Sequence, residues 1–134
     1  HSNENQVASG LYALGKIKDH HFQEHVLLMA ESNLMQKEMI KYCVGWALSQ
    51  LRNPAGYSIF KELLTQPFDK KHPIGHLNLF VQLDPEARYN VLDMMFNSWA
   101  KHKNTKERNA TIQHLENSHY DFTEEVKFIK EITS

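Results

Sequence analysis

The chain has 134 residues, of which 41% are hydrophobic and 23% charged, and these proportions are typical of a single globular domain. Fifteen Lys and Arg residues against sixteen Asp and Glu residues give a formal net charge of -1, so no overall field attracts nucleic acid or an anionic membrane. The single cysteine, Cys43, excludes an internal disulfide and a thiolate zinc site, which favours the cytoplasm or another reducing compartment. No membrane partner is expected, because no apolar run approaches the roughly 18 residues of a membrane-spanning helix.

The beginning of the chain is expected to be a disordered leader followed by two short helices. Residues 1–6, HSNENQ, are polar, and terminal polar segments are usually poorly ordered. Residues 7–134 then form a single helical domain. Its first two helices are VASGLYALGKIK and FQEHVLLMAE. Gly10 and Gly15 each weaken the first of them by about 1 kcal/mol relative to alanine.

The later helices have recognisable starts, where an N-cap residue is followed by proline or, three residues on, by an acid. These starts are Asn53-Pro54, Asp84-Pro85, Asn104 with Glu107, and Asp121 with Glu124. The longest helix is expected over 33–52, capped by Ser32 or Asn33. It should lie at the centre of the fold, because apolar residues cover much of its circumference.

The helix expected over 85–103 is apolar on one side only. Its polar residues, mostly turned toward solvent, are Glu86, Arg88, Asn90, Asp93 and Asn97. The last helix has a narrower apolar stripe formed by Phe122, Val126 and Ile129.

A loop with two prolines and a glycine, residues 65–76, divides the domain into helical halves at 7–65 and 74–134. The segment that follows, HLNLFVQL at 76–83, alternates apolar and polar residues as a strand does. A lone strand would leave its backbone groups unpaired, so a short helix is favoured. A strand would instead imply pairing across a dimer.

The predicted fold is therefore all-α, a single compact bundle of six or seven short-to-medium helices. The pairs 33–52/54–65 and 85–103/105–118 have similar lengths and short connections, so stacked helical hairpins with a HEAT-like geometry are an alternative. Two units would make a weak repeat, since about three are needed for stability.

The segment KDHHFQEH, residues 18–25, contains weak candidates for metal ligands. His21 and His25 are four residues apart and would share a face of a helix, with Asp19 and Glu24 nearby. The order of residues differs from the His-Glu-x-x-His signature, and Asp19 also suits an N-cap. The segment is interpreted as a capped helix start whose protonation could tune packing near about pH 6 to 7. No metal and no cofactor are predicted.

Catalysis is not expected. Cys43 falls in the most apolar helix, where burial disfavours a thiolate. The sequence contains no nucleophile elbow and no glycine-rich phosphate loop. The acid pair Glu124-Glu125, like Asp84 with Glu86, lies in a first helical turn, where the helix dipole favours acids.

The most asymmetric polar feature is KHKNTKER, residues 101–108, with four Lys and Arg residues against one Glu. This basic corner follows a stripe of Met and aromatic residues and could contact an acidic protein surface or phosphates. A solvated helix end is the simpler interpretation. The predicted partner-binding residues are Met94, Trp99, Lys101, Lys103, Lys106 and Arg108.

The leading functional hypothesis is a non-enzymatic adaptor or protein-protein interaction domain that presents a helical groove or a dimer surface to another protein or to a second copy. It is favoured because the helices over 33–52 and 85–103 carry more apolar surface than the short helices obviously cover. One alternative is a histidine/carboxylate bundle that binds a metal or small ligand. A second is nucleic-acid binding through residues 101–108, which the net charge does not favour.

Overall fold

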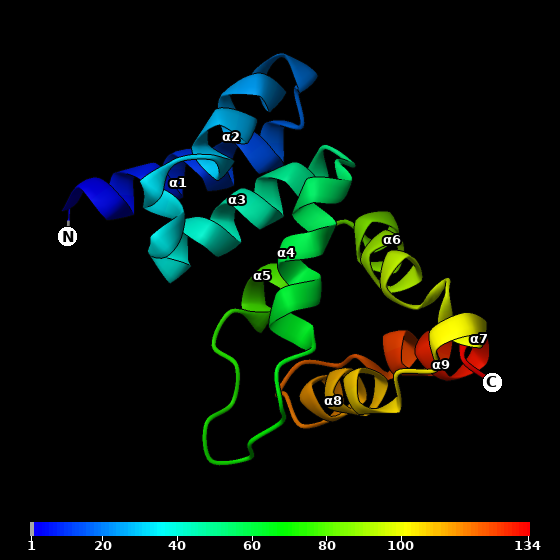
Figure 1. The fold of residues 1–134 in the computed structure, drawn as a ribbon. Coiled ribbons are helices and arrows are strands. Elements are labelled where there is room, and N and C mark those ends of the chain that lie inside the picture. Colours follow the sequence, from blue (N-terminus) through cyan, green and yellow to red (C-terminus); the bar gives the residue numbers. More distant parts are fainter. Residues whose placement is uncertain (1) are drawn as a thin grey trace.

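The computed structural model describes residues 2–134, and every regular element among them is a helix (Figure 1), which confirms the all-α prediction. In chain order the elements are α1 (Ser2–Ile17), η1 (His20–Phe22), α2 (Gln23–Ala30), η2 (Asn33–Gln36), α3 (Glu38–Gln50), α4 (Pro54–Leu64), α5 (Leu77–Gln82), α6 (Pro85–Phe96), α7 (Trp99–His102), α8 (Thr105–Glu116) and α9 (Thr123–Ile132), where η denotes a 3-10 turn. None of the described helices is both long and apolar enough to cross a bilayer.

The structure has more helices than the predicted six or seven because two expected helices are interrupted. The helix expected over 33–52 is divided at Lys37, whose backbone is extended (φ -87°, ψ 117°). Ser32 caps only the short turn η2 before that break, and its side chain accepts from the N–H of Leu34. The helix expected over 85–103 ends at Phe96, and the chain resumes as the single turn α7.

Helix α3 lies at the centre of the fold, as its apolar circumference predicts. Every residue from Tyr42 to Gln50 is buried. Helices α1 and α2 cover it on one side, and α4 packs against it on another (Figure 1). The close approach of α3 and α4 depends on Gly56, where an added Cβ would lie 2.7 Å from the carbonyl oxygen of Gly45.

The prediction of a disordered leader over 1–6 is wrong for residues 2–6, which belong to α1; His1 lies outside the described residues. The helix is anchored by apolar residues just beyond this segment, because Ala8 and Leu11 are buried against the core. Its first turn is also tied to the rest of the domain, since Glu4 lies 3.7 Å from Lys37 Nζ.

The two halves of the chain form one packed body. Helices α3 and α4 form the first of the two expected hairpins, and α6 packs on α4. The second hairpin does not form, because α6 and α8 pack chiefly against α4 and α9 and not against each other. The arrangement is therefore a bundle and not two stacked HEAT-like units.

The loop over 65–76 projects from this body between α4 and α5 (Figure 1). Helix α8 holds the start of the loop, because Thr111 Oγ1 donates to the carbonyl of Leu64 (3.0 Å) and His114 Nε2 lies 2.7 Å from the carbonyl oxygen of Gln66. After the loop the chain enters α5, so the segment over 76–83 is helical, as favoured, and not a strand.

Arg88, which was expected to face solvent, is instead paired with the buried Glu125. Arg88 does not point to solvent: its Nε donates to Glu125 (3.0 Å), and its Nη1 donates to the carbonyls of Val81 (2.8 Å) and Leu83 (2.7 Å). Glu125 is only 5% exposed, so its role goes beyond that of a first-turn acid. The pair joins α6 to α9, and Arg88 also supplies hydrogen-bond donors to two backbone carbonyls at the end of α5.

Candidate functional site

The basic corner stands where α6, α7 and the beginning of α8 meet. Lys103 adopts a left-handed conformation (φ 44°, ψ 46°) that ends α7 and reverses the chain. Asn104 then caps α8 as predicted, since its side chain accepts from the N–H of Glu107 (3.3 Å). The tight turn brings the cations on both sides of it to one end of the molecule.

A groove of about 610 Å³ opens beside this turn, and we call it the corner groove. It is lined by Lys61 of α4, Met95 and Phe96 of α6, Trp99 and His102 of α7, Lys103, and the polar residues Ser98, Asn104, Thr105 and Glu107. Phe96 is buried, whereas Met95 and Trp99 are half-buried. The accessible lining of the groove is therefore mainly polar and basic, with an apolar wall formed by Met95 and Trp99 over the buried Phe96.

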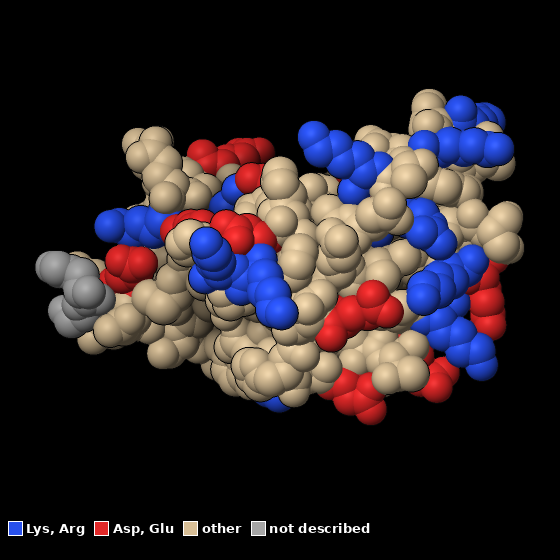
Figure 2. Space-filling view, turned by 90° about the horizontal axis from the view of Figure 1, so that it is seen from below, with Lys and Arg blue, Asp and Glu red and all other residues tan. Residues whose placement is uncertain are grey.

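The lysines of the corner are free to meet a ligand. Lys101, Lys103 and Lys106 are exposed, and among the described residues none of them forms an ion pair with a carboxylate. Figure 2 shows Lys and Arg side chains gathered at the right-hand end of the molecule, the end at which Figure 1 places α7.

Arg108 has a different role from the lysines. Its Nε donates to Thr133 Oγ1 (2.8 Å), which ties α8 to the end of α9. Its guanidinium carbon lies 5.9 Å from the centre of the Trp99 ring, at the distance of a cation-π contact. Arg108 therefore holds the indole in place at the groove.

The electrostatic potential of the corner is positive for two reasons. The basic corner has four cations and one acid, Glu107. The N-terminus of α8, a helix of 12 residues, adds the positive end of its dipole. An anionic group would be attracted here, and the apolar wall would accept a large hydrophobic side chain beside it.

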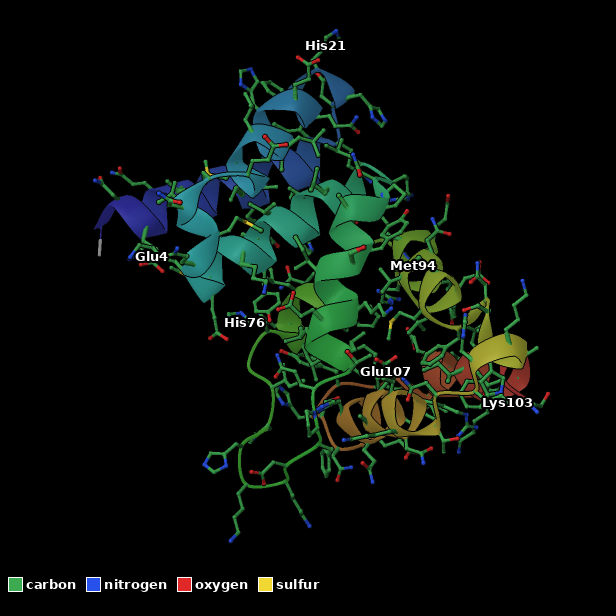
Figure 3. The ribbon with its side chains drawn as sticks, in the orientation of Figure 1. Glu4, His21, His76, Met94, Lys103 and Glu107 are labelled. Carbon is green, nitrogen blue, oxygen red and sulfur yellow. The ribbon has the colours of Figure 1, made fainter. Side chains whose placement is uncertain are left out.

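The predicted partner-binding residues are only partly brought together. Trp99 and Lys103 line the groove, while Lys101 and Lys106 flank it in sequence. Met94 does not line it, and its neighbour Met95 does. Figure 3 shows Lys103 at the outer edge of the corner and Met94 on α6, away from it.

Sequence reasoning missed Lys61, which reaches the groove from α4. Only the packing of α4 against α6 and α8 brings this residue to the corner. No local pattern in the sequence marks it.

No family model, curated protein or solved structure matches the chain.

The weak candidates for metal ligands do not form a site in the described part of the chain. His21 lies in the turn η1, and α2 begins at Gln23, so His21 and His25 do not share one α-helix. His21 Nδ1 lies 2.7 Å from Asp19 Oδ1, and no group of three or more His, Cys, Asp or Glu residues in residues 2–134 is arranged to hold a metal ion.

Asp19 is a cap, as the sequence indicates. Its side chain accepts from the backbone N–H of His21 (3.0 Å). This hydrogen bond, together with the contact to the His21 ring, lowers the pKa of Asp19 below its ordinary value of 3.8.

Cys43 lies inside the core, where its residue is 7% exposed. Burial raises the pKa of the thiol above its ordinary value of 9.0. A thiol in this state is a poor nucleophile at neutral pH.

Apolar side chains are also exposed at the other end of the molecule. The large apolar residues that remain most exposed are Ile17, Phe22, Leu28 and Leu34. They lie between the end of α1 and η2, a segment that Figure 1 places far from α7. Two lysines at this surface are ion-paired, Lys18 with Asp84 and Lys37 with Glu4, unlike the lysines of the corner.

Proposed function

We propose that the protein is a non-enzymatic interaction domain that binds another protein through the corner groove. The observation that carries this proposal is an open groove lined by two exposed lysines, Lys61 and Lys103, together with Met95, Phe96 and Trp99. Neither lysine is ion-paired to a described carboxylate. Half-buried apolar side chains surrounded by polar and charged groups are a common feature of protein-binding surfaces.

Several cations elsewhere in the fold are used differently. Lys41 is paired with Glu62, Arg88 with Glu125, and both Lys18 and Arg52 with Asp84. Those charges hold helices together. The lysines of the corner make no such internal pairs among the described residues, so their charge is available to a second molecule.

The proposal is tested by titrating isotope-labelled protein with a panel of short peptides of varied charge and hydrophobicity, and following the backbone amide resonances. For the peptides that bind, shift changes should be concentrated in residues 94–108 and around Lys61. Shift changes concentrated between Ile17 and Leu34, or no response to any peptide, would contradict the proposal.

A charge-reversal variant sharpens this test. Lys101→Glu, Lys103→Glu and Lys106→Glu together should abolish the response. The matched control is Lys70→Glu with Lys71→Glu, which changes two equally exposed lysines in the loop over 65–76. The control should bind as the unaltered protein does.

A further inference from the structure

We infer that the corner groove selects a short acidic segment of a partner protein, with one large apolar side chain placed among the acidic residues. This inference rests on the proposed function and specifies the chemistry of its partner. Two properties of the groove carry it: the sign and placement of its charges, and the way its apolar wall is held.

The charges reach the groove from separate parts of the fold. Lys103 lies on it at the turn between α7 and α8, and Lys61 lies on it from α4. Both are exposed, and neither is ion-paired to a described carboxylate. Among the residues that the structure describes, Glu107 is the only acid that lines the groove. A partner segment in the groove would therefore meet cations from two elements, which favours carboxylates spaced along the segment.

The apolar wall is held before any partner arrives. Trp99 is contacted by the guanidinium of Arg108, and that guanidinium is fixed by its hydrogen bond to Thr133. Phe96 is buried beneath the groove. Because these side chains are already ordered, binding of an apolar group against them costs little additional conformational entropy. The groove volume of about 610 Å³ exceeds that of a single side chain, so an anchor and its flanking residues fit.

Nucleic acid fits this surface less well. Proteins that bind DNA through its backbone commonly make about 6 to 10 phosphate contacts, whereas the basic corner has four Lys and Arg residues and Glu107 among them. Apart from Trp99, the groove wall is formed by Met95 and the buried Phe96, which offer no stacking platform for successive bases. Carboxylates flanking an apolar side chain match the arrangement more closely.

The two tryptophans provide a direct readout. Trp46 is fully buried, with 0% exposure, whereas Trp99 is half-buried at the groove. A ligand in the groove should change the emission of Trp99 and leave that of Trp46 unchanged. In the variant Trp99→Phe only Trp46 emits, so comparison with the unaltered protein gives the contribution of each tryptophan to the fluorescence.

The experiment compares four probes: an acidic ten-residue peptide of Asp and Glu with one central Phe, the same peptide with Ala in place of Phe, the same peptide with Asn and Gln in place of the acids, and a single-stranded oligothymidylate of equal charge. The acidic Phe peptide should change Trp99 emission and bind at least about tenfold more tightly than either peptide analogue. Lys101→Glu with Lys103→Glu and Lys106→Glu should weaken it at least about tenfold, and Lys70→Glu with Lys71→Glu should not. Circular dichroism of each variant checks that the fold is retained.

The outcomes separate the inference from the proposed function. Equal binding of the neutral and acidic peptides at the groove would overturn the inference and leave the interaction domain intact. Tighter binding of the oligothymidylate would overturn both in favour of nucleic acid. A failure of these probes and of the wider peptide panel to perturb the corner would also overturn both.

Discussion

Lys18 and Arg52 donate to the same carboxylate oxygen: Lys18 Nζ lies 2.8 Å, and Arg52 Nη2 3.3 Å, from Asp84 Oδ2. Both residues have a positive φ, 56° and 61°, a conformation that residues other than glycine seldom adopt. The backbone N–H of Asp84 donates in turn to Gln50 Oε1 (2.9 Å). Asp84 was expected to cap α6, but its side chain makes no capping hydrogen bond. It instead ties the end of α1 and the α3–α4 turn to the start of α6.

Asp84→Asn should lower the free energy of unfolding by about 1 kcal/mol at pH 7, a modest cost because the three side chains are partly exposed. The hydrogen bond from Lys18, then those from Arg52 and Gln50, lower the pKa of Asp84 below its ordinary value of 3.8, against the opposing effect of desolvation. A lowered native pKa means that the ionised form stabilises the fold. This stabilisation is present above about pH 3.8 and is lost as the pH falls through the native pKa.

Urea unfolding of both proteins as a function of pH measures this effect. The difference between them should be constant near neutral pH and should shrink in acid. The control Glu86→Gln removes an exposed carboxylate that lies 3.6 Å from Arg52 Nε, and its cost should stay below about 0.5 kcal/mol. A difference for Asp84→Asn that does not change with pH would contradict the ionic explanation.

Gly10→Ala and Gly15→Ala, both in α1, should change stability in opposite directions. A Cβ at Gly10 would meet nothing within 4 Å, so alanine should stabilise the helix by about 0.5 to 1 kcal/mol. A Cβ at Gly15 would overlap the ring of Trp46, which stacks on Tyr12 with ring centres 4.6 Å apart. Overpacking there should lower the free energy of unfolding by about 1 to 3 kcal/mol. Chemical denaturation gives both values, and a stabilising Gly15→Ala would show that α1 does not pack against Trp46 in this way.

Glu125→Gln should lower the free energy of unfolding by about 3 kcal/mol, because it leaves the charge of Arg88 buried without a counter-ion. The side chains of Arg88 and Glu125 are only 17% and 7% exposed. Arg88→Met should cost more, since it also leaves the carbonyls of Val81 and Leu83 without their donor.

The neighbouring substitution Glu124→Gln is the matched control for this pair. Glu124 is exposed and lies in the same helical turn, so its loss should change stability by less than about 0.5 kcal/mol. Thermal or urea unfolding of the three variants measures these differences. Equal effects at positions 124 and 125 would refute the role of the buried pair.

Cys43 should react with a thiol reagent at pH 8 at least about a hundredfold more slowly in the folded protein than in urea, because reaction requires opening of the core. The comparison protein has Cys43→Ala with Ser58→Cys. It places the thiol at an exposed position of α4 and should react at nearly the same rate in both solvents. Rapid reaction of Cys43 under native conditions would show that α3 is more accessible than its burial indicates.

Local signals in the sequence predicted much of the secondary structure. The N-cap residue Asn53 followed by Pro54 begins α4, and Asn104 caps α8, because capping depends on neighbours in the chain. The helical character of α5 followed from the absence of a partner strand. These features could be predicted because their causes lie within a few residues.

Features that depend on packing were missed. The helical start of α1 and the break at Lys37 lie where α1 and η2 pack against α3, and Lys37 is paired with Glu4 of α1. Arg88 was placed on the solvent side because the apolar period of α6 does not reveal that α9 covers it. Of the six predicted partner-binding residues, Trp99 and Lys103 line the corner groove, whereas Lys61 is brought there by tertiary contacts alone.

The loop over 65–76 offers a site at which the chain can be cut into two fragments. Residues 69–73 are all exposed, while the start of the loop is held by Thr111 and His114 of α8. A single cut between Lys70 and Lys71 would therefore leave two fragments that meet across the interface of α4 with α6 and α8. Such fragments should remain associated, and each would supply one lysine of the corner groove: Lys61 from the first and Lys103 from the second.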